Sequence, residues 1–164
     1  MMKSKTAKWF ETKVRYEKTM DDGMQKKVTE QYTVDALSFT EAENTIIEEM
    51  SVYISGEFEV TDIKMATYKE VFFSDNEKDD RWYKAKLQFI TIDEKTEKEK
   101  RTNNFFLIQA ATLPQAVKYV EEVMGKTMID YVIAGIAETQ IMDVYEHKVA
   151  SATEKKDDKP EYEA

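Results

Sequence analysis

Two stretches of the chain alternate apolar and polar residues and resemble each other closely. One begins at Trp9 and the other at Trp82, each Trp is followed by an aromatic residue, and both stretches place a lysine fifth, Lys13 and Lys86. Alternation with a period of two predicts strands that are covered on one side. The stretches are 73 residues apart and the match continues downstream with one inserted residue, which indicates that one structural unit is used twice.

Each unit follows the order strand, strand, helix, strand. The first unit is predicted to contain strands at 8–18 and 26–36, a helix at 39–54 and a long strand at 58–73 with a bulge near 61–63. The second unit is predicted to contain strands at 82–92 and 101–110, a helix at 113–124 and a last long strand within 130–147. Capping boxes that begin at Ser38 and Thr112 mark the two helix starts.

These elements predict an α+β fold built from two tandem ββαβ repeats with pseudo-twofold symmetry. We expect an antiparallel-rich sheet with both helices on one face. The single domain would span residues 8–147, with repeats at 8–73 and 81–147 and a polar linker at 74–80. Residues 1–7 and the charged tail at 148–164 are predicted to be disordered because they hold few apolar residues.

Composition narrows the functional classes. The chain of 164 residues has no cysteine, which excludes disulfides, zinc–thiolate sites and a thiol nucleophile. No apolar run is long enough for a membrane span and no signal peptide is evident, so we expect a cytoplasmic protein without membrane contact. The net charge of −9 argues against general nucleic-acid binding, yet residues 1–33 carry 8 Lys and Arg against 5 Asp and Glu. Residues 81–108 likewise carry 7 against 4.

No grouping of residues points to catalysis. The single histidine, His147, lies at the start of the tail and is expected to be solvated. Asp75, Asp79 and Asp80 lack the ordered spacing of a calcium loop. Phosphate-binding and metalloprotease motifs do not occur. We therefore predict a protein that is not an enzyme and that uses no cofactor or metal.

The two tryptophans have basic neighbours on their own strand faces. The candidate binding face consists of Trp9, Lys13, Arg15, Trp82, Lys84 and Lys86. In one interpretation each Trp packs against the other repeat or a partner subunit, with lysine stems lying over it. In the other, an open sheet face binds single-stranded nucleic acid, because bases stack on rings while basic side chains follow the phosphates.

Other surfaces leave further alternatives open. Phe105 and Leu107 make their strand apolar on both faces, which suits a central strand or an oligomer contact. The acidic helices could mimic nucleic acid, could contact a basic partner, or could simply keep the protein in solution. A carboxylate-based enzyme would need a cleft with two acids in unlike environments. Our main prediction is non-enzymatic binding through a protein or self-association surface, and the alternative is single-stranded nucleic-acid binding.

The aromatic–lysine strand starts, the helix entry around Ala42 and the run from Tyr68 to Phe72 resemble an uncharacterised family of Bacteroidetes and their phages or mobile elements. The resemblance covers about residues 8–147. It implies a cytoplasmic protein, and it supplies no catalytic residues.

Overall fold

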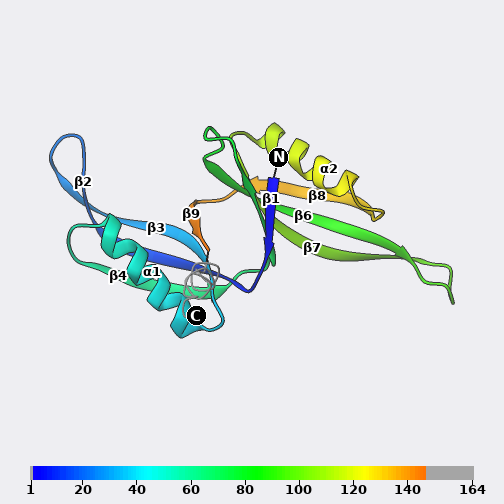
Figure 1. The fold of residues 1–164 in the computed structure, drawn as a ribbon, viewed down its shortest axis with the longest axis horizontal. Coiled ribbons are helices and arrows are strands. Elements are labelled where there is room, and N and C mark those ends of the chain that lie inside the picture. The colour runs from blue at the N-terminus through cyan, green and yellow to red at the C-terminus, as the bar shows by residue number, and fades with distance from the viewer. Residues whose placement is uncertain (1, 147–164) are drawn as a thin grey trace, which may run out of the picture.

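A computed structural model describes residues 2–146 of the chain, which form two β-sheets and two helices (Figure 1). The elements in chain order are β1 (Met2–Thr6), β2 (Trp9–Thr19), β3 (Gln25–Asp35), α1 (Phe39–Tyr53), β4 (Phe58–Met65), β5 (Glu70–Ser74), β6 (Arg81–Ile92), β7 (Glu99–Ala110), α2 (Leu113–Gly125), β8 (Asp130–Glu138) and β9 (Ile141–Tyr145). The four-stranded sheet has the order β4-β2-β3-β9, and the five-stranded sheet has the order β1-β5-β7-β6-β8. The predicted α+β class is confirmed.

Helix α1 covers one face of the four-stranded sheet. Its first turn is capped as predicted, because Ser38 Oγ accepts a hydrogen bond from the Glu41 N–H at 3.1 Å. Ala42, Ile46 and Met50 recur at helical spacing and are buried against the apolar side of β2 and β3. Burial of this stripe, rather than helix propensity alone, holds α1 in place.

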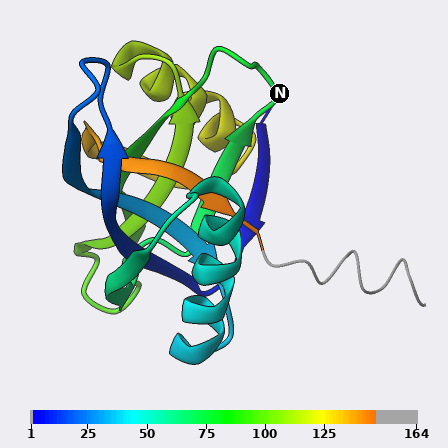
Figure 2. The ribbon, with the colours of Figure 1, turned by 90° about the vertical axis from the view of Figure 1, so that its left-hand side faces the viewer.

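Helix α2 covers the five-stranded sheet in the same manner. Thr112 Oγ1 accepts a hydrogen bond from the Gln115 N–H at 3.3 Å, and the helix then buries Ala116, Val120 and Met124. The last two contact a core with Leu87 that lies on one face of the sheet. Figure 2 shows α1 and α2 on different sides of the pair of sheets. The chain therefore forms two sheets that are each covered by one helix, in place of the expected single sheet with both helices on one face.

The two predicted long strands are each divided between the sheets. The run at 58–73 forms β4 in one sheet and β5 in the other, and the run at 130–147 forms β8 and β9 in the same way. At each break the backbone donates a hydrogen bond to the tryptophan near the start of the hairpin in the same half. The Ala66 N–H donates to the Trp9 carbonyl and the Thr139 N–H donates to the Trp82 carbonyl, both at 2.9 Å. A local hydrophobic pattern does not reveal such a change of sheet.

Each half of the chain thereby gives its last strand to the other half. Strand β5 pairs in parallel with β7, and β9 pairs in parallel with β3. The four-stranded order β4-β2-β3-β9 has a counterpart in β8-β6-β7-β5 of the larger sheet. Both β4 and β8 also shift register at matching places, opposite Lys13/Val14 and Lys86/Leu87. The connectivities correspond, while the predicted pseudo-twofold rotation between the halves stays a prediction.

Residues at the N-terminus are ordered, so the prediction of disorder over 1–7 is wrong for the described residues. Strand β1 pairs in antiparallel register with β5, from Met2 opposite Ser74 to Thr6 opposite Glu70. Lys5 Nζ also lies 2.6 Å from Asp35 Oδ2. The partner strand is about 70 residues away in the sequence, and its backbone hydrogen bonds compensate for the weak local pattern. The predicted tail at 148–164 and His147 lie outside the described residues.

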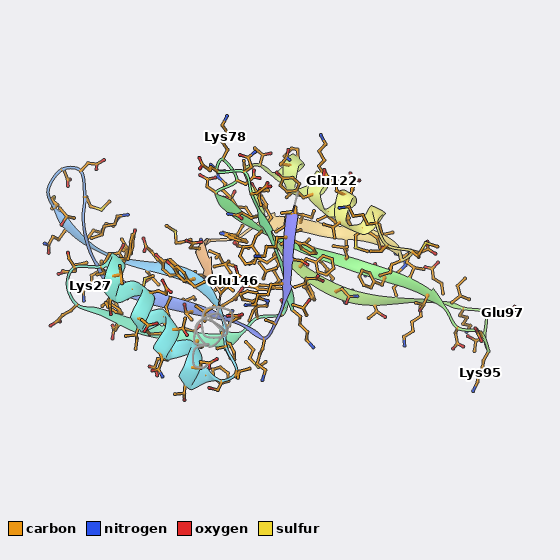
Figure 3. The ribbon with its side chains drawn as sticks, in the orientation of Figure 1. Lys27, Lys78, Lys95, Glu97, Glu122 and Glu146 are labelled. Carbon is orange, nitrogen blue, oxygen red and sulfur yellow. The ribbon has the colours of Figure 1, made fainter. Side chains whose placement is uncertain are left out.

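The molecule is elongated, with the two long hairpins at opposite ends (Figure 1). The turn between β6 and β7, with Lys95 and Glu97, lies at one tip, and Lys27 lies in the other half (Figure 3). Glu97 has a φ of 59°, a left-handed conformation that closes this turn. Neither helix between residues 2 and 146 is long and apolar enough to cross a bilayer.

Candidate functional site

Both tryptophans of the candidate binding face are buried where the two sheets meet. Trp9 is 1% exposed and Trp82 is 2% exposed. The ring of Phe73 lies between them, with its centroid 6.4 Å from Trp9 and 5.7 Å from Trp82. Trp9 Nε1 donates a hydrogen bond to the Lys69 carbonyl at 3.1 Å. Trp82 thus packs against Phe73 of the other half, as one interpretation expected, and Trp9 lies in the same buried cluster. Neither ring is open for bases to stack on.

This cluster belongs to a core that joins the two sheets, which we call the seam. Its buried residues are Trp9, Tyr68, Val71, Trp82, Leu107, Ile141 and Val144. Leu107 lies on β7, between β5 and β6, so of the two alternatives for its strand the central position is confirmed. The faces of the sheets that turn away from the helices therefore meet at the seam, and they separate toward the hairpin tips (Figure 1).

The basic residues of the two strands do not come together as one face. Lys13 and Arg15 lie on β2 in the four-stranded sheet. Strand β4 places Asp62 opposite Lys13 and Glu59 opposite Arg15 in register. On the same face, Lys64 Nζ lies 3.8 Å from Glu11 Oε1. Carboxylates of the neighbouring strand thus balance the charge of this sheet face.

The basic residues of β6 have a different environment. Lys84 lies opposite Ala137 of β8 and Leu107 of β7, and Lys86 lies opposite Gly135 and Phe105. Both lysines are half-buried. Lys84 Nζ lies 5.2 Å from the centre of the Phe105 ring, a cation–π contact. No carboxylate stands across from either lysine on the two adjacent strands.

Strand β8, the outer neighbour of β6, carries no charged side chain between Asp130 and Glu138. It forms an edge of the five-stranded sheet, so one side of its backbone meets no other strand within residues 2–146. Tyr131, Ile133 and Ile136 pack at the border of the core beneath α2. The residues that face away from α2 are small or aliphatic. Gly135 and Ala137 are exposed, and Val132 is half-buried.

The matching edge strand of the other sheet is charged. Strand β4 carries Glu59, Asp62 and Lys64 at the register positions where β8 has Val132, Gly135 and Ala137. Folded proteins commonly protect edge strands with charged side chains, which oppose pairing with another chain. One sheet edge therefore has this protection and the other does not. The absence of charge over 131–137 is visible in the sequence, but its meaning depends on the knowledge that β8 is an edge.

Buried polar groups elsewhere are engaged in hydrogen bonds within the fold. Glu30 Oε1 accepts from the hydroxyls of Tyr16 at 3.1 Å and Tyr32 at 2.9 Å. Burial and the adjacent Glu30 carboxylate raise the pKa of both tyrosines. Asp79, which lies in the predicted polar linker, is 3% exposed and accepts a hydrogen bond from the Tyr119 hydroxyl at 2.5 Å.

A groove of about 920 Å³ lies beyond the C-terminal end of α1, beside the last residues of β2. It is lined by three basic residues, Arg15 among them, and by three glutamates. The hydroxyl of Tyr16 in its wall is already bound to Glu30. Such a mixed lining favours no single class of ligand. Across residues 2–146 no group of three or more His, Cys, Asp or Glu side chains is placed to hold a metal ion.

Comparison with known proteins places this architecture in a family. Searches of the curated proteins and of the solved structures find no match. The sequence model of a family described as a domain of unknown function (DUF4494) matches residues 8–147. This range runs from just before β2 to just beyond β9 and includes the seam and the edge strands β4 and β8. Because the match covers most of the chain, the protein belongs to the DUF4494 family.

Proposed function

We propose that the protein is a non-enzymatic binding protein that takes up an extended polypeptide segment along the edge of β8. The observation that carries this proposal is the unprotected edge of the five-stranded sheet. Strand β8 lacks charged side chains over 131–137, whereas its counterpart β4 carries three. Addition of a strand to an exposed sheet edge is a common mode of peptide recognition, in which backbone hydrogen bonds supply the affinity.

The length and support of β8 favour this mode. The strand has nine residues, longer than the mean strand of about five to six residues. It pairs with β6 from Tyr83 to Ile90, so its backbone is held extended before any partner arrives. A pre-organised edge reduces the conformational entropy that binding has to overcome.

The proposal that the protein is not an enzyme rests on the hydrogen bonds of two buried carboxylates, Glu30 and Asp79. Glu30 accepts two tyrosine hydroxyls, and Asp79 accepts the hydroxyl of Tyr119. These carboxylates lie in different parts of the fold, one under α1 and one beside α2. A carboxylate-based reaction would require two acids in a shared cleft.

A labelled synthetic peptide tests strand addition directly. The probe has ten residues that alternate Thr and Val, and its binding to the full chain is followed by fluorescence anisotropy. We expect saturable binding by the wild-type chain. The same peptide with methylated backbone nitrogens at alternate residues should bind at least about tenfold more weakly, because it cannot donate the ladder hydrogen bonds. Equal binding of both peptides would overturn the proposal.

Two other occupants would also contradict it. Sedimentation of the chain over a wide range of concentration reports pairing with a second copy, and a stable dimer that excludes the probe would make β8 a self-association surface. A 20-nucleotide single-stranded DNA that binds at about 50 mM salt and competes with the probe would favour nucleic-acid recognition.

A cytoplasmic location and an association with Bacteroidetes and their mobile elements, which the sequence resemblance implies, stay predictions.

A further inference from the structure

We propose that the segment bound along β8 is acidic, and that its carboxylates meet Lys84 and Lys86. This inference rests on the proposed strand addition and specifies the chemistry of the partner. Its starting point is that the two sheets differ in the residues that stand opposite the basic side chains of β2 and β6.

In the four-stranded sheet, an acidic residue stands opposite each of Lys13 and Arg15 of β2. Lys13 of β2 is opposed by Asp62 of β4, and Arg15 is opposed by Glu59. Opposite charges on adjacent strands stabilise a sheet, because their side chains lie side by side on one face. The neighbouring strand thus supplies the carboxylates in this sheet.

The five-stranded sheet has the basic residues Lys84 and Lys86 on β6 but no acidic residues opposite them. Lys86 of β6, at the position of Lys13, is opposed by Gly135, and Lys84 is opposed by Ala137. Within the described part of the chain, Lys86 makes no ion pair, and the contact of Lys84 is with the Phe105 ring. This face therefore has basic groups to which residues 2–146 supply no opposite charge.

The small residues of β8 leave room for an acid from outside. Strands lie about 4.8 Å apart, so a segment added beside β8 would lie about 10 Å from β6. Gly135 has no side chain and Ala137 has only a methyl group, so β8 does not block the stem of Lys86. Lys84 can extend in the same direction once its Nζ leaves the Phe105 ring on β7. A Glu or Asp on the added strand, at a position that faces away from α2, would then meet them.

The local charge of the β6–β7 hairpin favours an acidic partner, although the charge of the whole chain does not. The chain as a whole has a net charge of −9, which repels acidic molecules. Residues 81–108, which cover most of the β6–β7 hairpin, carry 7 Lys and Arg against 4 Asp and Glu. The locally basic hairpin places Lys84 and Lys86 next to β8, whose residues 131–137 carry no charge. An acidic segment would therefore meet attractive charge beside an unpaired backbone edge.

Three probes of one length and different charge test the inference. Ten-residue peptides alternate Val with Thr, with Glu or with Lys, and their affinities are measured at about 50 mM and about 500 mM salt. We expect the Glu peptide to bind about three- to tenfold more tightly than the Thr peptide at low salt, since two exposed ion pairs contribute modestly. The Lys peptide should bind most weakly, and the differences should shrink at high salt.

Matched variants locate the effect. Lys84→Gln with Lys86→Gln keeps most of each stem, removes the charge and should abolish the preference for the Glu peptide. The control, Lys13→Gln with Arg15→Gln on β2, should keep the preference. In Gly135→Asp the new carboxylate stands opposite Lys86, as Asp62 does opposite Lys13. This variant should weaken binding of the Glu peptide, and an added Cβ at Gly135 meets no atom within 4 Å.

The possible failures are distinguishable. If the Thr peptide binds and the Glu peptide binds no better, the acidic partner is wrong and strand addition stands. Equal loss of the preference in the β2 control would place the acidic site elsewhere and would also overturn the inference. If no peptide binds at either salt concentration, both this inference and the proposed function fail.

Discussion

At the scale of single residues, Trp82 has the clearest role. Its ring is 2% exposed and contacts Phe73 edge to face, at the place where the two sheets meet. We predict that Trp82→Ala lowers the free energy of unfolding by about 3–5 kcal/mol, because a large buried ring leaves a cavity. Urea denaturation followed by circular dichroism measures this loss. Lys98→Ala, in an exposed turn, is the control and should change the stability by less than about 0.5 kcal/mol.

The tyrosines around Glu30 predict how stability depends on pH. Burial raises the pKa of Tyr145 to about 12, while an ordinary tyrosine titrates near 10. The folded chain therefore holds this proton more tightly than the unfolded chain. The contribution to stability is full below pH 10 and is lost as the pH rises through 12. We expect the free energy of unfolding to fall between pH 10 and 12, and to fall less steeply in Tyr145→Phe. An identical slope in the two proteins would contradict this role.

At the scale of elements, helices and hairpins could be predicted from the sequence, and the change of sheet could not. The capping residues Ser38 and Thr112 begin α1 and α2 as expected. The predicted bulge near 61–63 corresponds to the register shift of β4 against Lys13 and Val14. These features depend on local interactions. Strands β5 and β9, in contrast, are fixed by partners in the other half, which no local pattern reveals.

The candidate site was predicted in part for the same reason. Lys84 and Lys86 were singled out by their alternation with apolar residues, and they lie beside the unprotected edge. For Trp9 and Trp82 the sequence left two interpretations, packing against the other half or an open face, because it does not show that the other sheet covers their side of the strand. Strand β8 was missed as a site. A run without charge looks the same in a central strand and in an edge strand, and only the sheet order separates them.

Exchanging the edge residues of the two strands tests the importance of charge at the level of an element. The variant Glu59→Val, Asp62→Gly, Lys64→Ala gives β4 the residues of β8. We expect this variant to bind the neutral Thr–Val peptide at a second site or to self-associate, because its edge protection is gone. Titration of the peptide and sedimentation velocity measure the two outcomes. A variant that binds one peptide and stays monomeric would show that charge does not protect β4.

At the scale of the whole molecule, the exchange of strands couples the two halves. Strand β5 belongs to the first half and pairs in the second, and β9 does the reverse. Both tryptophans lie in the seam between the sheets, so their fluorescence reports this contact, while circular dichroism reports both sheets. We predict that the two signals change together in a single urea transition. A fluorescence change that precedes the loss of secondary structure would show that the sheets separate first.

The account as a whole depends on the location of the bound segment. Backbone hydrogen exchange, measured by mass spectrometry on the full chain with and without the Glu–Val peptide, reports this location directly. We predict that the peptide slows exchange in β8, over 130–138, because its outer amides become hydrogen-bonded. Exchange in β4, over 58–65, should remain unchanged. Protection of β4 instead of β8, or binding without protection of either edge, would contradict the account.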